Sequence, residues 1–221
     1  MKHIVVIGAG GHGREVAEII RHQAQQGDSS SLLGFIDDNC RLQGQIIDGL
    51  PVLGDWSWLE GADQSKVAVI CAVGRPEVCR RLVQRAQAFG LSFASAISPL
   101  AHISPLAQIG QGVTVFPHVV INTGAYLSNY CILNVGVTIS HDTKVGRYSN
   151  VNPGVHLAGN VTIGEGCYIG MDAQVIQRRS IGPWTVVGAG AIVVRDLPAN
   201  VTAVGVPATV IKSRREGWHE R

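Results

Sequence analysis

An aliphatic residue returns at every sixth position over almost half of the chain. The positions are Ile97, Ile103, Ile109, Val115, Ile121, Leu127, Leu133, Ile139, Val145, Val151, Leu157, Ile163, Ile169, Val175, Ile181, Val187 and Val193. A mostly small residue follows four places later, as at Ala107, Val113, Ala125, Cys131 and Ala173. A period of six with one large and one small inward residue predicts a parallel β-helix, in which three short sides make one coil of about 18 residues.

Residues 18 apart in such a helix stack on successive coils, so neighbours follow from the sequence. His141 should have Gly159 above it, and Asp142 should have Gly124 below it. A histidine under a glycine leaves an open notch beside the imidazole, which suits a long, thin ligand. Asp142 could orient that imidazole, but neighbouring residues on a strand point apart unless the chain turns a corner there. A single surface histidine is more often without a catalytic role, so the pattern makes His141 a candidate and leaves the question open.

The first part of the chain has a different pattern. An apolar strand over residues 3–7 runs into the glycine-rich turn of residues 8–13, and an amphipathic helix follows. Gly8, Gly10 and Gly13 satisfy the spacing of a dinucleotide-binding turn. A full dinucleotide fold needs two mononucleotide halves, and too few residues precede the repeat for both. We therefore expect an α/β, half-Rossmann-like domain over residues 1–96 that holds one nucleotide diphosphate, followed by the β-helix and its cap over residues 97–221.

Two acidic residues follow the second predicted strand, residues 32–36. Asp37 and Asp38 should lie at the carboxyl edge of the small sheet, beside the glycine turn, where a ribose or base could be held. A solvated turn is the alternative. A third strand over residues 66–73 ends at Gly74, and a helix opens at residues 75–77. Trp56 could stack on a base, although packing against the sheet is the commoner role of such a residue.

Composition narrows the class of partner. The net charge is +2 and only 15% of residues are charged, so no basic stripe suggests nucleic acid. Flat, weakly charged sides predict packing of copies against one another, and we expect a homotrimer. A secretory signal and a membrane-spanning apolar run are both missing from the sequence, so we expect a cytoplasmic protein without membrane insertion. The five cysteines have no paired spacing and should be free, buried thiols.

The histidines of the repeat raise the question of zinc, because some hexapeptide β-helix proteins are metal-dependent carbonic anhydrases. His102, His118, His141 and His156 are not spaced 18 apart and form no close pair, so no metal site is expected.

Several motifs together resemble one family. They are Ile-Gly-Ala-Gly-Gly-His-Gly at 7–13, Phe-Ile-Asp-Asp at 35–38, Ser-His-Asp at 140–142, Ala-Gly-Asn-Val at 158–161 and Gly-Val-Pro-Ala at 205–208. The chain resembles the sialic-acid O-acetyltransferase family of hexapeptide-repeat acyltransferases, which includes N-acetyltransferases of nucleotide-linked 4-amino-4,6-dideoxy sugars. The resemblance implies a left-handed β-helix, acetyl-CoA as co-substrate and a nucleotide-linked amino sugar as acceptor.

The resemblance also implies roles for individual residues. His141 would be the general base, assisted by Asp142. The nucleotide sugar would be held by Gly10, Gly11, His12, Asp37, Asp38 and Gly74. Acetyl-CoA would lie near Asn150, Gly159, Met171 and Ala189. Some family members have a histidine in place of Asn150 and a glycine in place of Ala189, so these two positions depart from the pattern.

The repeat breaks after Val194, and the Gly-Val-Pro-Ala segment should cap the last coil, whose backbone groups would otherwise stay unpaired. Arg178, Arg179 and Lys212 could meet coenzyme phosphates or could simply be solvated. Arg179 falls in the small inward column, so we expect a local bulge there.

These features predict an enzyme that moves acetyl from acetyl-CoA to the 4-amino group of a nucleotide-linked amino-deoxy sugar in bacterial glycan or O-antigen synthesis. O-acetylation of sialic acid or another sugar is an alternative reaction. A nucleotide-sugar-binding assembly protein is the non-enzymatic alternative, and the glycine turn leaves a nicotinamide-dependent oxidoreductase as a further one.

Overall fold

The computed structural model describes residues 3–27 and 30–220. The chain divides into two compact units, one made mainly of residues 3–99 and the other mainly of residues 100–220.

The first unit is built on a mostly parallel sheet. Its strands are β1 (His3–Ile7), β2 (Ser31–Ile36), β3 (Ile46–Ile47), β4 (Leu50–Gly54), β5 (Val67–Cys71) and β6 (Ser92–Phe93), in the spatial order β3-β4-β2-β1-β5-β6. β1 pairs in parallel with β2 on one side and with β5 on the other. The chain therefore leaves β1 at a switch point, and ligands of open α/β sheets bind outside the carboxyl ends of the strands at such a point.

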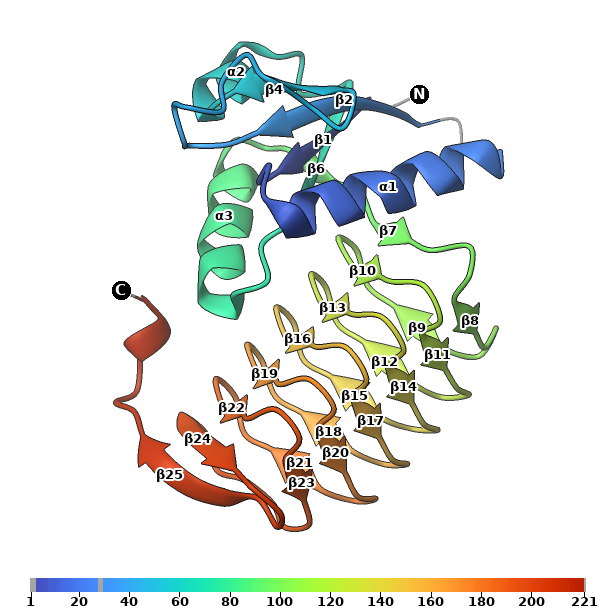
Figure 1. Cartoon of the computed structure of the whole chain (residues 1–221), viewed down its shortest axis with the longest axis vertical. Helices are drawn as coiled ribbons and strands as arrows, with labels where there is room; N and C mark the ends of the chain where they lie inside the picture. The colour runs from blue at the N-terminus through green and yellow to red at the C-terminus, as the bar shows by residue number, and fades with distance from the viewer. Residues whose placement is uncertain (1–2, 28–29, 221) are drawn as a thin grey trace. The chain divides into compact units, whose positions relative to one another are not determined.

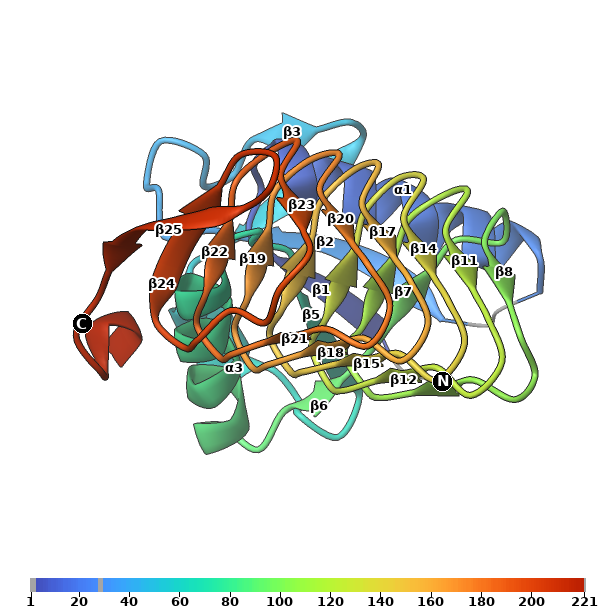
Figure 2. The ribbon, with the colours of Figure 1, turned by 90° about the horizontal axis from the view of Figure 1, so that it is seen from below.

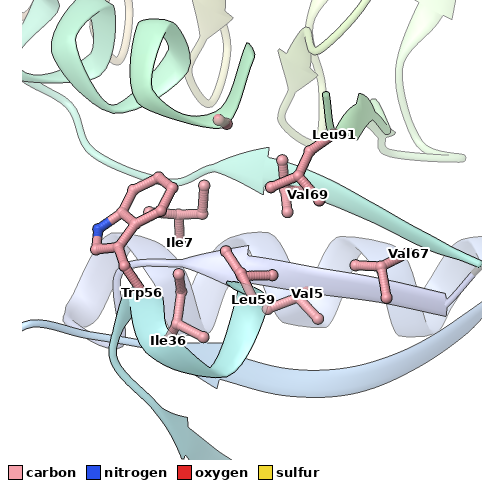
Figure 3. Packing of buried hydrophobic residues seen from close by; sticks show 9 residues of the cluster. Val5, Ile7, Ile36, Trp56, Leu59, Val67, Val69 and Leu91 are labelled. Carbon is pink, nitrogen blue, oxygen red and sulfur yellow. The ribbon is translucent and has the colours of Figure 1, made fainter. Parts of the chain in front are cut away.

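Three helices belong to this sheet: α1 (Gly11–Gln25), α2 (Trp56–Gly61) and α3 (Pro76–Ala88). α1 begins at the glycine turn without a side-chain cap, and Asp55 caps α2 by accepting a hydrogen bond from the Ser57 amide. Side chains of β1, β2 and β5 pack with Trp56 and Leu59 of α2 into one apolar cluster (Figure 3). This cluster fixes the sheet edge from which the glycine turn and the two aspartates project.

The second unit is a three-sided parallel β-helix (Figures 1 and 2). The chain enters it from β7 (Ala96–Ile97). Its first side holds β10 (Thr114–Val115), β13 (Ile132–Leu133), β16 (Asn150–Val151), β19 (Tyr168–Ile169) and β22 (Val186–Val187). The second side holds β8 (His102–Ile103), β11 (Val120–Ile121), β14 (Thr138–Ile139), β17 (His156–Leu157), β20 (Gln174–Val175) and β23 (Ile192–Val193). The third side holds β9 (Gln108–Ile109), β12 (Tyr126–Leu127), β15 (Lys144–Val145), β18 (Thr162–Ile163) and β21 (Ser180–Ile181).

The pairing register confirms the 18-residue coil. Thr138 pairs with His156, and His156 pairs with Gln174, so each step to the next coil adds 18 residues. The aliphatic positions from Val115 to Val193 are buried, whereas the earlier ones, from Ile97 to Ile109, are partly exposed. The hexad therefore fills the prism axis with apolar side chains, and the residues between them reach the surface at known heights.

The prediction of a bulge at Arg179 is wrong. β18 and β21 stay in register through Thr162 and Ser180, and the Arg179 carbonyl accepts the Thr162 amide as an undistorted coil requires. The Arg179 side chain is about one-third exposed, and its guanidinium lies 3.8 Å from the Asp196 carboxylate. Its long aliphatic stem lets the charge leave the interior without any change in the backbone.

The last coil is closed by a hairpin and a short tail. β24 (Val201–Val204) pairs in parallel with β22 and in antiparallel fashion with β25 (Thr209–Ser213). A 3₁₀ turn, η1 (Trp218–Glu220), follows and brings the His219 ring against the Trp184 ring, with 3.7 Å between the ring centroids. The predicted cap is therefore a strand pair with an aromatic contact that fastens the tail to the β-helix.

Candidate active site

His141 and Asp142 lie at the corner between the second and third sides, just after β14. Asp142 has a left-handed backbone conformation, with φ of 58°. That turn places both side chains together, and Nδ1 of His141 lies 2.9 Å from Oδ2 of Asp142. The two side chains are 57% and 60% exposed, so the pair stands at the surface, where a substrate can reach it. The corner thus resolves the question that strand geometry alone left open.

Two glycines make room for this pair. A Cβ at Gly159 would lie 2.4 Å from Nε2 of His141, so the imidazole covers the bare backbone of the next coil. A Cβ at Gly124 would lie 2.5 Å from Oδ1 of Asp142, on the preceding coil. The His141 imidazole therefore occupies the space that a side chain at position 159 would fill, and the Asp142 carboxylate occupies the space that a side chain at position 124 would fill. The notch predicted over His141 is filled by the imidazole itself.

A hollow of about 290 Å³ lies on the second side, next to this corner. It is lined by Thr138, Ser140, His156, Leu157, Ala158, Gln174, Val175, Ile176 and Gln177. Thr138 Oγ1 lies 2.8 Å from Nδ1 of His156, which fixes the orientation of that ring. Ser140 and Ala158 directly precede His141 and Gly159, so the hollow ends at the dyad. Sequence reasoning missed this lining, although the 18-residue columns contain it.

The residues predicted to contact acetyl-CoA do not gather at one place. Gly159 lies at the dyad corner, whereas Met171 and Ala189 share a column at the corner between the first and second sides. Met171 is 53% exposed, and Asn150 is 4% exposed on the first side. In a single chain Gly159 and the Met171–Ala189 column thus lie at opposite edges of the second side, and Asn150 lies on the first side.

The basic residues proposed for coenzyme phosphates are also separated. Arg178 is exposed in the turn after Gln177, and Arg179 is held beside Asp196. Lys212 is exposed on β25, where it lines a hollow of about 270 Å³ together with Ser213, Arg214, Arg215 and Trp218. Lys212 therefore lies beside two further cationic side chains, those of Arg214 and Arg215.

A second candidate site lies at the carboxyl edge of the first unit's sheet. A pocket of about 200 Å³ is lined by Ile7, Gly8, Ile36, Asp37, Asp38, Trp56, Val73, Val78 and Leu82. The ends of β1, β2 and β5 meet there, so the switch point predicted to hold a nucleotide does form a pocket. The tryptophan lines it while packing on Phe89, with 6.1 Å between ring centroids.

Asp37 holds the glycine turn in shape. Its Oδ2 accepts the Ala9 amide and its Oδ1 accepts the Asn39 amide, each at 2.9 Å. Gly13 packs so closely that a Cβ there would meet the Gly8 carbonyl. Gly10 and Gly11 are exposed and have no atom within 4 Å of a built Cβ, so their backbone is open to a ligand. The turn therefore contains two open glycines supported by one closely packed glycine and one carboxylate.

His12 and Gly74 are the remaining predicted contacts. His12 lies in the first turn of α1, with Nδ1 3.7 Å from Glu15, and burial lowers the pKa of its imidazole although Glu15 acts to raise it. Gly74 lies between β5 and α3, directly after Val73 of the pocket. Neither residue lines the pocket itself, so their roles as substrate contacts stay predictions. Within residues 3–27 and 30–220, no three His, Cys, Asp or Glu side chains gather as metal ligands.

Comparisons with known proteins match both units. Residues 3–86 match the PglD N-terminal domain, and residues 142–177 match the bacterial transferase hexapeptide family of six repeats. A GDP-perosamine N-acetyltransferase of Escherichia coli is 29% identical over 214 residues, which cover 94% of this chain and 95% of that protein. The crystal structure of PerB from Caulobacter crescentus, in complex with CoA and GDP-perosamine, is 33% identical with a TM-score of 0.88, covering 96% of this chain and 98% of that one.

The chain belongs to the hexapeptide-repeat sugar acetyltransferases. The acetyltransferase domain of PglB from Neisseria gonorrhoeae is a further relative, 33% identical with a TM-score of 0.87, covering 96% of this chain and all of that one. These relatives confirm the predicted family, the left-handed β-helix fold and the enzyme class. Other structures of the Caulobacter enzyme are of variants in which a histidine is replaced by asparagine or by alanine.

Members of the hexapeptide-repeat sugar acetyltransferases have been solved with CoA or with acetyl coenzyme A, which is the co-substrate predicted for this chain. In the part of the chain that the structure describes, no helix has the length and hydrophobicity needed to cross a membrane. The individual site residues are not identified by these relatives and stay predictions.

Proposed function

We propose that this acetyltransferase moves an acetyl group from acetyl-CoA to the 4-amino group of a nucleotide-linked amino-deoxy sugar for bacterial glycan synthesis. Relatives of this activity match the chain over nearly its whole length, and one of them holds CoA and GDP-perosamine together. GDP-perosamine is therefore the first acceptor to test. The observation that carries the proposal is the His141–Asp142 pair, for which a glycine on each neighbouring coil leaves room.

His141 acts as the general base through Nε2. Its Nδ1–H donates to Asp142, which leaves Nε2 as the acceptor. The sugar amine attacks the thioester carbonyl, a C–N bond forms, and Nε2 takes the proton that the nitrogen loses. The tetrahedral intermediate then expels the coenzyme thiolate as the C–S bond breaks, and the imidazolium returns the proton to sulfur. Asp142 stabilises the imidazolium between these two transfers.

The hollow on the second side is assigned to the acyl donor. It ends at the dyad, and its lining alternates apolar and polar groups: Leu157, Ala158 and Ile176 beside Thr138 and Gln174. A pantetheine arm has the same character, because methylene segments separate its two amides. The arm would place its thioester beside Nε2 of His141.

The nucleotide portion of the acceptor is assigned to the first unit. The open backbone at Gly10 and Gly11 forms the start of a 15-residue helix whose first turn contains no acidic residue. Free amides and the helix dipole at such an end favour a phosphate. Asp38 is exposed at the pocket, whereas Asp37 already accepts two amides, so Asp38 is the better placed of the two to bind a ribose or base.

We propose that the enzyme works as a homotrimer in the cytoplasm. The predicted donor contacts at Met171 and Ala189 lie on a different corner from His141 and Gly159, and packing of β-helices side by side would let one subunit supply each corner. Val135 and Met171 expose 43% and 53% of their surface along that corner, which is apolar area a partner would cover. Acetyl-CoA and nucleotide sugars are both cytoplasmic metabolites.

The test is an assay of free CoA released from acetyl-CoA with GDP-perosamine, with UDP- and dTDP-linked 4-amino sugars, and with matched hydroxyl sugars. We expect turnover with an amino sugar and a loss of about 10²- to 10⁴-fold in His141→Ala, with the KM for acetyl-CoA little changed. Asp142→Asn should cost less, about tenfold or more, because the base remains. Turnover with hydroxyl sugars alone would replace the proposal by O-acetylation. A His141→Ala enzyme with more than about a third of normal turnover would exclude that residue as the base.

Mass measurement in solution tests the assembly. A stable monomer at micromolar concentration would exclude both the trimer and a donor site shared between subunits.

A further inference from the structure

The hairpin that closes the last coil exposes apolar side chains, although the end caps of repeat proteins usually have a polar outer face. β24 and β25 lie at the end of the stack of coils (Figures 1 and 2). Val206, in the turn of the hairpin, exposes 69% of its surface, and Val210 and Ile211 on β25 expose 44% and 64%. Aliphatic side chains gain free energy when they leave water, so this group marks a surface that another body covers.

The shape of the hairpin argues against a further β-strand as that body. β25 is the outer strand of its sheet, and its pairing with β24 shifts register between Thr202 and Ala203. Lys212 pairs with Thr202 and Val210 pairs with Ala203, so Ile211 is an extra residue that forms a bulge. A bulge bends an edge strand and interrupts the row of hydrogen-bonding groups that a neighbouring strand needs. A strand of another protein, or of a second copy of this chain, is therefore a poor partner for this edge.

Basic side chains directly follow the apolar ones. Lys212 and Arg215 are exposed, and Cζ of Arg214 lies 4.5 Å from the ring centroid of Trp218. These side chains line the hollow of about 270 Å³ at the end of the β-helix. Glu216 is exposed beside them, so three basic residues and one acidic residue leave this short segment with a positive charge. An anionic partner is therefore favoured over a neutral one.

A lipid surface combines the two properties that this end of the molecule requires. Anionic headgroups offer phosphate to ammonium and guanidinium groups, and the acyl boundary just below them offers an apolar medium. Tryptophan rings are enriched at the same depth. A free phosphate or a coenzyme phosphate would pair with the charges and leave the aliphatic side chains in water. All five residues of β25 are exposed, so side chains on both faces of this strand border the edge that a flat surface would meet.

We propose that the end of the β-helix binds an anionic lipid surface through a cap surface made of Val206, Val210, Ile211, Lys212, Arg215 and Trp218. The aliphatic side chains enter the boundary between headgroups and acyl chains, and the basic side chains pair with lipid phosphates. So few groups give an association comparable to that of one myristoyl chain, with a constant of about 10⁴ M⁻¹, which is reversible. This inference goes beyond the proposed function, because it assigns a place of work to the enzyme and leaves its reaction unchanged.

Flotation with vesicles tests the partner. The full chain is mixed, without substrates, with vesicles of phosphatidylglycerol and phosphatidylcholine or with vesicles of phosphatidylcholine alone. We expect binding only where phosphatidylglycerol is present, and we expect binding to fall at least about tenfold when the salt is raised from about 0.1 M to about 1 M. Binding to neither kind of vesicle, or equal binding to both, would overturn the inference.

Two variants separate the charge from the apolar contact. The double variant Lys212→Gln with Arg215→Gln should weaken vesicle binding about 30-fold, because each basic side chain near an anionic surface contributes about a factor of five. Ile211→Ser should weaken it about tenfold, because serine has no aliphatic group to bury in the acyl boundary. Lys144→Gln and Ile46→Ser are the matched controls and should bind as the natural protein does, since Lys144 is exposed on β15 and Ile46 exposes 67% of its surface on β3.

Three further outcomes would overturn the cap surface. Natural binding in both cap variants would place the lipid contact elsewhere, and an equal loss in Lys144→Gln and the double variant would show attraction without a defined surface. A double variant that binds vesicles normally but has a raised KM for acetyl-CoA would assign the two cations to the coenzyme. Turnover of acetyl-CoA is measured without vesicles, so failure of the proposed function and failure of this inference give different results. Thermal unfolding of each variant checks that the β-helix is intact.

Discussion

Gly159→Ala is the sharpest single test of how the dyad is built. A Cβ at this position would lie 2.4 Å from Nε2 and 2.5 Å from Cε1 of His141, whereas an ordinary contact begins at 3.4 Å. The imidazole would have to move by about 1 Å, and a misplacement of that size can cost about 10²-fold in rate. The ring is 57% exposed and can swing outward, so the fold should tolerate the change.

We expect Gly159→Ala to lower kcat about 100-fold with little change in thermal stability. The assay is turnover of acetyl-CoA with the amino-sugar acceptor, measured in a double-mutant cycle with His141→Ala. If the methyl group acts only through the imidazole, it should cost nothing further once the imidazole is gone. Thr162→Ala serves as control, because Thr162 is exposed on the same coil but lies outside the hollow on the second side.

Two results would refute this reasoning. A Gly159→Ala enzyme with more than about a third of normal turnover would mean that the imidazole does not need its position over residue 159. A further rise in the KM for acetyl-CoA in the His141→Ala background would mean that Gly159 acts by lining the donor path.

Three further predictions concern other parts of the chain. Asp37→Ala should raise the KM for the nucleotide sugar and leave the KM for acetyl-CoA unchanged. It should also lower the unfolding midpoint, because the Ala9 and Asn39 amides lose their acceptor. A change in the KM for acetyl-CoA alone would contradict the assignment of the nucleotide to the first unit. Burial lowers the folded-state pKa of His12 below 6.5, so the unfolded chain binds a proton first as the pH falls. Between pH 7.5 and pH 5.5, the free energy of unfolding in urea should fall more in the natural protein than in His12→Gln. Equal falls in the two proteins would exclude a contribution from His12. The prediction that all five cysteines are buried is wrong for Cys40, which is exposed. Burial raises the pKa of the Cys131 and Cys167 thiols to about 12, so a thiol reagent at pH 8 should modify Cys40 quickly and these two only after unfolding.

The sequence predicted the β-helix well because its interior obeys one rule. An aliphatic residue at every sixth place can be buried only if the chain turns three times per coil, and the register then places Gly159 next to His141. The pairing of His141 with Asp142 could not be read in the same way. It depends on the left-handed backbone at Asp142, which the alternation of side chains along a strand does not reveal.

Interactions made outside the repeat were harder to predict. Arg179 was expected to force a bulge, but Asp196, which lies after the repeat has ended, gives its charge a partner at the surface. The sequence predicted that Asp37 binds the nucleotide sugar, whereas the structure shows that both of its carboxylate oxygens already accept hydrogen bonds from backbone amides.

The position of the dyad within the stack of coils has a consequence for how the enzyme loses structure. Each coil contacts only the coils directly above and below it, so opening spreads from the ends of the stack inward. His141 lies on β-helix coils that have further coils on both sides, while the β24–β25 hairpin and the tail held by Trp184 lie at the end. Amide hydrogens of the terminal hairpin should therefore exchange first and those around the base last. Sequence change can accumulate at the ends of the stack while the coils that perform the reaction keep their spacing.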